Sequence, residues 1–143
     1  MEEILEFLKL YLDYIIFGIL GFMGFIAIWL SIERLVFFKR VKFEDFHSLN
    51  DLEENLSKNM TTLYIIYSNA PYIGLLGTVG GIIVTFYTMS ISEGIDPKRI
   101  MADLSLALEA TGAGLIVAIP ALMAYNGLLR KIDILVNRYK AKQ

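Results

Sequence analysis

Two residue types with a large role in protein chemistry are almost missing from this sequence. There is no cysteine, and His47 is the only histidine. Without cysteine the chain can form neither disulfide bonds nor thiolate metal sites. A lone histidine without neighbouring ligand candidates makes a poor metal site, so a solvated or capping histidine is the simpler interpretation. The sequence therefore predicts no metal site and no cofactor.

A strong excess of charge is missing as well. The 13 basic and 15 acidic residues give a formal net charge of −2, which offers no reason to expect nucleic acid as a partner. No combination of nucleophile, base and orienting group can be assembled from the sequence. The glycine-rich stretch GLLGTVGG, residues 74–81, lacks the lysine of a phosphate-binding loop. We therefore expect a protein that is not an enzyme.

Charge is absent altogether from three long stretches of the chain. They cover residues 14–32, 59–92 and 110–129 and hold 19, 34 and 20 residues. A helix needs about 20 apolar residues to cross the hydrocarbon core of a bilayer, where an ionised side chain is costly. Hydrophobic residues make up 56% of the chain, and its mean hydropathy is +0.57. The sequence thus predicts an all-α, multi-pass membrane protein with three transmembrane helices in a single domain.

The segment boundaries follow from these stretches and their flanks. The polar segment between the first two helices has phenylalanine and leucine at spacings of three and four, which is an amphipathic pattern. The third helix is expected to extend beyond the bilayer at its C-terminal end. The expected segments are helix one at 8–38, the polar segment at 39–62, helix two at 63–91, a loop at 92–99 and helix three at 100–138.

Four further residues mark local features of these helices. Asp96 followed by Pro97 is typical of a helix N-cap with proline at the first helical position. Pro71 lies inside helix two and Pro120 inside helix three. Membrane helices tolerate proline when neighbouring groups satisfy the freed carbonyl, so we expect a kink at each.

The charges beside the apolar stretches predict how the helices are oriented. The leader MEEILEFLKLYLD is acidic, whereas basic residues follow the first and third stretches. Because positively charged flanks stay in the cytoplasm, the N-terminus and the 92–99 loop are expected outside, and the 39–62 segment and the C-terminus inside. The acidic leader and the lack of a small-residue cleavage site argue against a cleaved signal peptide.

Helices two and three each carry a narrow stripe of small and hydroxylated residues at spacings of three and four, which place them on one helix face. One interpretation is helix packing, because small residues allow close approach and threonine can hydrogen-bond within its own helix. The other is a surface facing a polar group on another chain, and both can hold together. The stripes are Gly74, Thr78, Gly81, Thr85 and Thr88, and Ala107, Thr111, Gly114, Ala118, Ala121 and Tyr125.

Glu109 is a candidate intramembrane acid. It lies well inside helix three, where a carboxylate suggests a function and a partner. It lies two positions before Thr111, about 200° around the helix, so it cannot share the threonine stripe. We expect it to make a structural hydrogen bond, to a hydroxyl such as that of Ser105 or to an adjacent subunit. Carrying a proton is the alternative role.

Two blocks of the sequence resemble a known family. Residues 70–81, APYIGLLGTVGG, resemble the APxxGLLGTVxG signature of the ExbB/TolQ proteins, distant relatives of the flagellar MotA stator. Residues 107–126, ALEATGAGLIVAIPALMAYN, are similar to the family pattern ALxxTAxGLxxAIPAxxxYN. The pair Glu33 and Arg34 is a weaker third match. Together the three matches touch every expected span.

The resemblance implies a subunit of a proton channel in the bacterial inner membrane. Family members form a homo-oligomeric ring, typically a pentamer, around two copies of a single-span partner of the ExbD/TolR type. The partner supplies a membrane aspartate. Protons pass through this aspartate, and the resulting motion is coupled to a TonB-type or TolA-type protein that delivers work to the outer membrane.

The resemblance also implies residue roles. Thr78 and Thr111 match the two threonines that the family places at the lumen. Many relatives carry a glutamate five residues before the second threonine, where this chain has Leu106. The short 39–62 segment favours an ExbB-type role over a TolQ-type role, and a packing scaffold or small channel without a dedicated partner is an alternative from another class. The remaining residues expected along the proton pathway or lumen are Thr85, Gly74, Gly81, Gly114 and Ala118.

Overall fold

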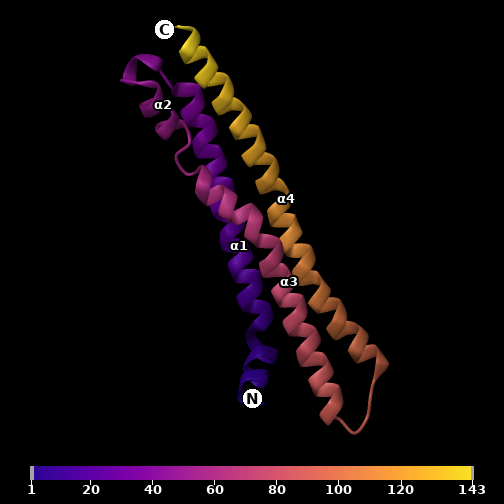
Figure 1. Ribbon diagram of the computed structural model, residues 1–143. Coiled ribbons are helices and arrows are strands. Elements are labelled where there is room, and N and C mark those ends of the chain that lie inside the picture. Colours follow the sequence, from indigo (N-terminus) through magenta and orange to yellow (C-terminus); the bar gives the residue numbers. More distant parts are fainter. Residues whose placement is uncertain (1, 143) are drawn as a thin grey trace.

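The computed structural model describes residues 2–142, and in this range the chain is helical without strands. This confirms the predicted all-α class. Long helices run side by side, and the short elements lie at the end of the bundle near the C-terminus (Figure 1). In chain order the elements are α1 (Glu2–Arg40), the 3₁₀ turn η1 (Phe43–Asp45), α2 (Leu49–Leu56), α3 (Met60–Ile91) and α4 (Pro97–Ala141).

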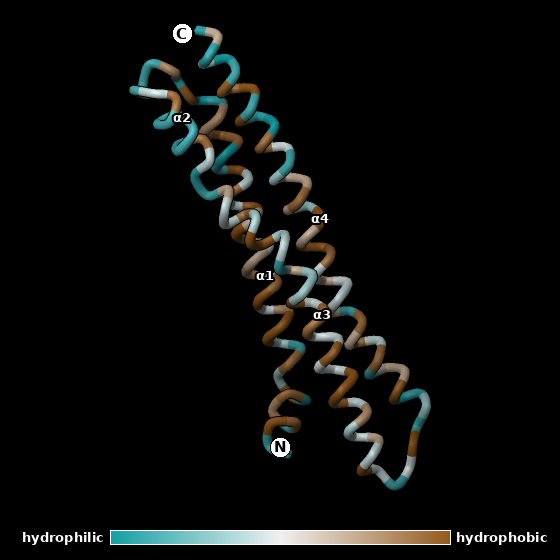
Figure 2. The backbone as a smooth tube through the Cα atoms, in the orientation of Figure 1, coloured by the Kyte–Doolittle hydropathy of each residue, from teal (hydrophilic) through white to brown (hydrophobic). Residues whose placement is uncertain are grey.

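Three of these helices, α1, α3 and α4, are long and apolar enough to cross a membrane. Hydrophobic residues predominate in the middle of α1 and alternate with less hydrophobic ones along α3 and α4, and hydrophilic residues gather toward the α2 end and at the α3–α4 loop (Figure 2). The single chain buries little of this apolar surface: in α1 only 17% of the most hydrophobic window is buried. The three predicted spans are therefore confirmed by length and composition.

The helices extend further than the expected spans. α1 begins at Glu2 rather than at residue 8, and α4 covers Pro97–Ala141 rather than 100–138. Acidic residues in the first turn of α1 and basic residues in the last turn of α4 complement the helix dipole, which favours continued helix beyond the apolar stretch. The Asp96 side chain accepts a hydrogen bond from the Lys98 N–H at 3.1 Å, which confirms the predicted N-cap.

The segment expected at 39–62 contains η1 and α2, and α3 begins at Met60, three residues before the expected start at residue 63. Ser48 caps α2 by accepting a hydrogen bond from the Asp51 N–H at 3.1 Å. Leu52 and Leu56 are completely buried on the inner face of α2, as the amphipathic spacing predicts. They join a core cluster that also contains residues of α1, α3 and α4. The short helix is thereby fixed against the bundle.

α3 and α4 share the most extensive contact of the fold, and α1 packs against both. One core cluster lies toward α2 and includes Leu63 and Leu128. A second cluster, with Ile16 and Leu20, lies nearer the N-terminus of α1. α3 and α4 each continue through an internal proline, Pro71 and Pro120, so the kinks at these residues stay predictions.

Candidate functional site

The two predicted stripes face each other across the contact between α3 and α4. A Cβ atom placed on Gly74 would lie 2.5 Å from the Ala110 carbonyl oxygen, and one on Gly114 would lie 2.6 Å from the Ala70 carbonyl oxygen. Contacts this short leave room only for glycine, so the two backbones touch here. Nearer the α3–α4 loop, a Cβ atom placed on Gly81 would lie 2.8 Å from the Cβ atom of Ala107. Small residues therefore serve the close packing of these two helices.

Thr78 and Thr111 meet at the middle of this contact and form its main polar feature. Thr78 Oγ1 donates a hydrogen bond to the Ala107 carbonyl oxygen at 2.6 Å. The two threonine hydroxyls are also hydrogen-bonded to each other. Because a hydroxyl carries one proton, the donation from Thr78 to Ala107 leaves Thr111 to donate to Thr78. We call these two residues the threonine pair.

The threonine pair has a defined chemical capacity. Thr78 is 7% exposed, and Thr111 is half-buried. Within residues 2–142 no acid or base hydrogen-bonds to either hydroxyl, so nothing activates them as nucleophiles. The Thr111 oxygen can accept a hydrogen bond from a passing polar group, and it can donate to one only by giving up its bond to Thr78. Neither exchange carries the desolvation cost of a fixed charge.

The stripes continue beyond the pair in both directions along the contact. Toward the α3–α4 loop, Thr85 donates to the Gly81 carbonyl oxygen at 2.9 Å and Thr88 to the Val84 carbonyl oxygen at 2.9 Å, so each bonds within its own helix. Toward α2, Ala118 is buried in the cluster shared by all three long helices.

A cluster of three tyrosines at the α2 end of the stripes was not predicted as a site. The rings of Tyr67 and Tyr125 are 5.0 Å apart, and Tyr64 lies 5.2 Å from Tyr67. Tyr125 was recognised as part of the helix-three stripe, but its partners come from α3. The spacing of three between Tyr64 and Tyr67 is the only signal in the sequence that places them on one face.

Glu109 lies apart from this site. Its side chain is exposed on the surface of α4, and among residues 2–142 it makes no hydrogen bond or ion pair. The expected bond to Ser105 is therefore not formed within the described chain. The neighbouring Leu108 is 62% exposed and Ile116 is 74% exposed, so the carboxylate sits on an apolar surface.

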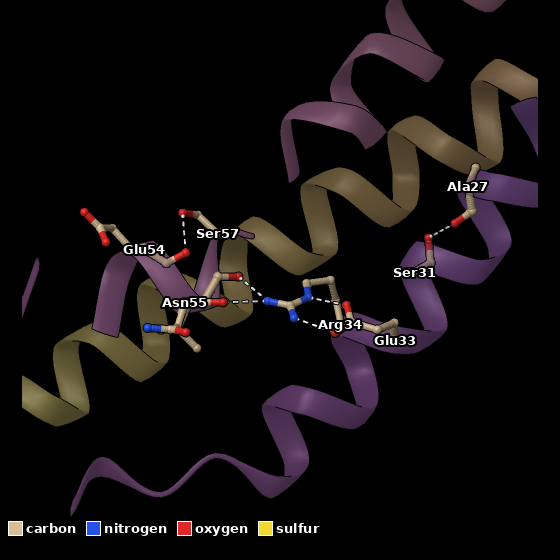
Figure 3. A network of polar contacts seen from close by, with 8 residues as sticks. Ala27, Ser31, Glu33, Arg34, Glu54, Asn55 and Ser57 are labelled. Atoms are coloured by element: carbon tan, nitrogen blue, oxygen red, sulfur yellow. Dashed lines mark hydrogen bonds and ion pairs between the residues drawn. The ribbon is translucent and has the colours of Figure 1, made fainter. Parts of the chain in front are cut away.

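Arg34 forms a second polar centre, at the α2 end of α1 (Figure 3). The residue is 2% exposed, and its Nη1 donates to the carbonyl oxygens of Asn55 at 2.6 Å and Leu56 at 3.2 Å. Nε and Nη2 donate to the two carboxylate oxygens of Glu33. The guanidinium also lies 4.4 Å from the centre of the Phe37 ring. Arg34 thus binds the carbonyl end of α2 to α1.

Comparison with known proteins places this arrangement in a family. The family model for the MotA/TolQ/ExbB proton channel family matches residues 44–141. The chain is 52% identical over 133 residues to "Biopolymer transport protein ExbB" of Helicobacter pylori, covering 93% of this chain and 92% of that protein. It is 47% identical over 132 residues to the protein of the same name from Aquifex aeolicus, covering 92% of this chain and 86% of that one.

A more distant relative has a different name. "Tol-Pal system protein TolQ" of Pseudomonas aeruginosa is 36% identical over 87 residues, which cover 61% of this chain and 38% of that protein. The matched region of the family model contains the threonine pair, both internal prolines and Glu109. With three apolar helices of membrane-spanning length and a hydroxyl pair buried between two of them, the chain belongs to the MotA/TolQ/ExbB proton channel family.

Proposed function

We propose that this protein is the ExbB-type subunit of a proton-driven complex in the bacterial inner membrane. In this proposal it acts with a single-span partner of the ExbD type and couples proton flow to a TonB-type protein. High identity over nearly the whole length of two proteins named ExbB supports this role. The TolQ relative matches a smaller part of its own length, which makes a TolQ-type role the second candidate.

The observation that carries the proposal is the threonine pair. It places two neutral hydroxyls at the contact of two apolar helices, far from either helix end. A partner carboxylate that enters the membrane needs hydrogen-bond donors, because burial without them would hold it protonated. In a ring of copies, the edge of the α3–α4 contact would present these hydroxyls to the central helices.

The proposal assigns the remaining residues by their place along the same contact. Thr85 continues the hydroxyl surface toward the α3–α4 loop, while Gly74, Gly81, Gly114 and Ala118 hold the two helices close. Close packing leaves a surface without bulky side chains, which suits a partner helix that moves past equivalent positions. In this proposal the same α3–α4 contact packs the two helices together and forms the lumen surface.

Native mass spectrometry of the purified chain, alone and co-expressed with its single-span partner, tests this function. We expect a ring of five copies that captures two partner helices, and proton uptake by proteoliposomes that contain the complex. A monomer or dimer that does not bind the partner would contradict the proposal and favour the role of a packing scaffold. Replacing the partner with a TolR-type protein serves as the control that separates the ExbB-type from the TolQ-type role.

A further inference from the structure

A polar cleft opens at the end of the bundle where the α3–α4 loop lies. Its volume is about 180 Å³, and its walls come from the first turns of α1, the last turns of α3 and the first turns of α4. One water molecule needs about 10–15 Å³ of such space, so the cleft has room for several. The residues that carry charge or a hydroxyl in its walls are Lys9, Asp13, Thr85, Thr88, Arg99 and Asp103.

A second, smaller cleft of about 90 Å³ adjoins the first. Four residues line both: Thr85, Thr88, Arg99 and Asp103. The second cleft reaches the loop itself, where Ser92 and Asp96 lie exposed. The two clefts together therefore connect the aqueous end of the bundle with the interior of the α3–α4 contact.

The inner end of the larger cleft comes next to the threonine pair. Gly81 and Ala107 line it there. The carbonyl oxygen of Ala107 accepts the hydrogen bond from Thr78 at 2.6 Å, so this residue lines the cleft and contacts the pair. Ala107 thus belongs both to the wall of the cleft and to the hydrogen-bonded surroundings of the hydroxyls that the proposed function uses.

The charged groups of the cleft are not neutralised by direct pairing. Among residues 2–142 the only ion pair is that of Arg34 with Glu33, so Asp13 and Asp103 have no cation within bonding distance, although Lys9 and Arg99 share the cleft. Both aspartates are half-buried. A carboxylate in that position needs water or a hydrogen-bond donor, because desolvation without one is costly. The composition of the cleft is that of a hydrated site and differs from the apolar groove between α1 and α4 that surrounds Pro120.

We propose that this cleft is a water-filled access path for protons from the loop side of the membrane to the threonine pair. Asp103 is the side chain that exchanges protons with the water in the path. Its carboxylate takes a proton from hydronium, which leaves water, and returns the proton to a water molecule nearer Ala107. The proton-carrying part of this proposal rests on the proposed function, whereas the hydration of the cleft does not.

Single cysteines test the path, because the chain has no native cysteine to react in the background. The variants are Thr88→Cys at the mouth, Thr85→Cys deeper in the cleft and Gly94→Cys in the open loop, where nothing lies near a new Cβ. Leu108→Cys, on the outer surface of α4, is the control. Each variant is co-expressed with the single-span partner, and a charged, membrane-impermeant thiol reagent is added to one side of the membrane at a time.

We expect Thr85→Cys and Thr88→Cys to be labelled from the same side as Gly94→Cys, and Leu108→Cys to stay at background. An unlabelled Thr85→Cys beside a labelled Thr88→Cys would overturn the path, because water would then stop at the mouth. Equal labelling of Leu108→Cys would overturn it too, since the reagent would not distinguish the cleft from the outer surface.

Proton uptake by proteoliposomes tests the role of Asp103. Asp103→Asn is expected to lower the uptake rate several-fold, whereas Asp133→Asn, an exposed aspartate far along the same helix, should leave it unchanged. Equal rates in the two variants would overturn the proton path even if the cleft is hydrated. If the parent complex takes up no protons, the proposed function fails instead, and the cysteine labelling still decides whether the cleft holds water.

Discussion

At the scale of single residues, the hydroxyl of Thr111 can be separated from its bulk. Valine keeps the volume of threonine and removes the donor that reaches Thr78. Interhelical hydrogen bonds in membranes average about 0.6 kcal/mol, so Thr111→Val should leave the fold intact. We expect it to abolish proton uptake by the complex with its partner, while Thr111→Ser retains it. Uptake at the parent rate in Thr111→Val would contradict the functional role of the threonine pair.

The glycines of the contact allow a matched comparison at the same scale. Gly74→Ala places a methyl group 2.5 Å from the Ala110 carbonyl oxygen, so the two backbones must separate. Overpacking of this kind costs about 1–3 kcal/mol. Thermal unfolding in detergent should show a lower midpoint for Gly74→Ala. Gly112→Ala, where nothing lies within 4 Å of the added carbon, is the control and should match or exceed the parent. Equal unfolding midpoints for Gly74→Ala and Gly112→Ala would show that α3 and α4 can separate enough for the methyl group at little cost in stability.

At the scale of elements, α2 depends on one side chain of α1. Arg34 donates to two carbonyl groups at the end of α2, and no other residue type has the same planar set of donors. Hydrogen bonds from a charged group contribute about 1.5–3 kcal/mol. Loss of about 2 kcal/mol corresponds to roughly 30-fold faster hydrogen exchange in Leu49–Leu56 if local opening controls it.

We therefore expect Arg34→Met to speed amide exchange in α2 while the middle of α1 stays protected, as measured by mass spectrometry. Arg34→Lys should give an intermediate rate, because lysine keeps the charge but not the bidentate geometry. Arg40→Met, an exposed position on the same helix, is the control. Unchanged exchange in Arg34→Met would mean that buried leucines such as Leu52 hold α2 in place without the arginine.

Long elements were predictable from the sequence for a simple physical reason. A charge-free stretch has few alternatives to a membrane helix, and the cap at Asp96 is a local pattern. The spacing of glycine and threonine predicted a shared face on each helix but not that the two faces meet, because spacing within one helix carries no information about its partner. The contact of Arg34 with Asn55 and Leu56 spans 21 and 22 residues and uses main-chain carbonyls, so no pattern of side chains signals it.

At the scale of the whole molecule, the chain leaves most of the apolar surface of its long helices without contact to its own residues. Phe22 on α1 is 65% exposed, and Met123 on α4 is 70% exposed. Such residues suit lipid or another membrane chain. Glu109 does not suit lipid, because a carboxylate facing acyl chains is expensive. Its position on the apolar surface of α4 therefore favours a neighbouring copy or partner helix that covers this part of α4 and hydrogen-bonds to the carboxyl group.

Two substitutions of Glu109 distinguish a structural bond from proton carriage. Glutamine keeps the size and hydrogen-bonding capacity of the side chain but cannot release a proton, whereas leucine loses both. If the Glu109 carboxyl group makes a structural hydrogen bond to another chain, Glu109→Gln should retain both the oligomer and proton uptake. Glu109→Leu should then shift native mass spectra toward smaller species. If Glu109→Gln instead stops uptake in an intact oligomer, the residue carries protons, and the structural assignment is wrong. If Glu109→Leu leaves the oligomer in native mass spectra unchanged, no other chain covers Glu109.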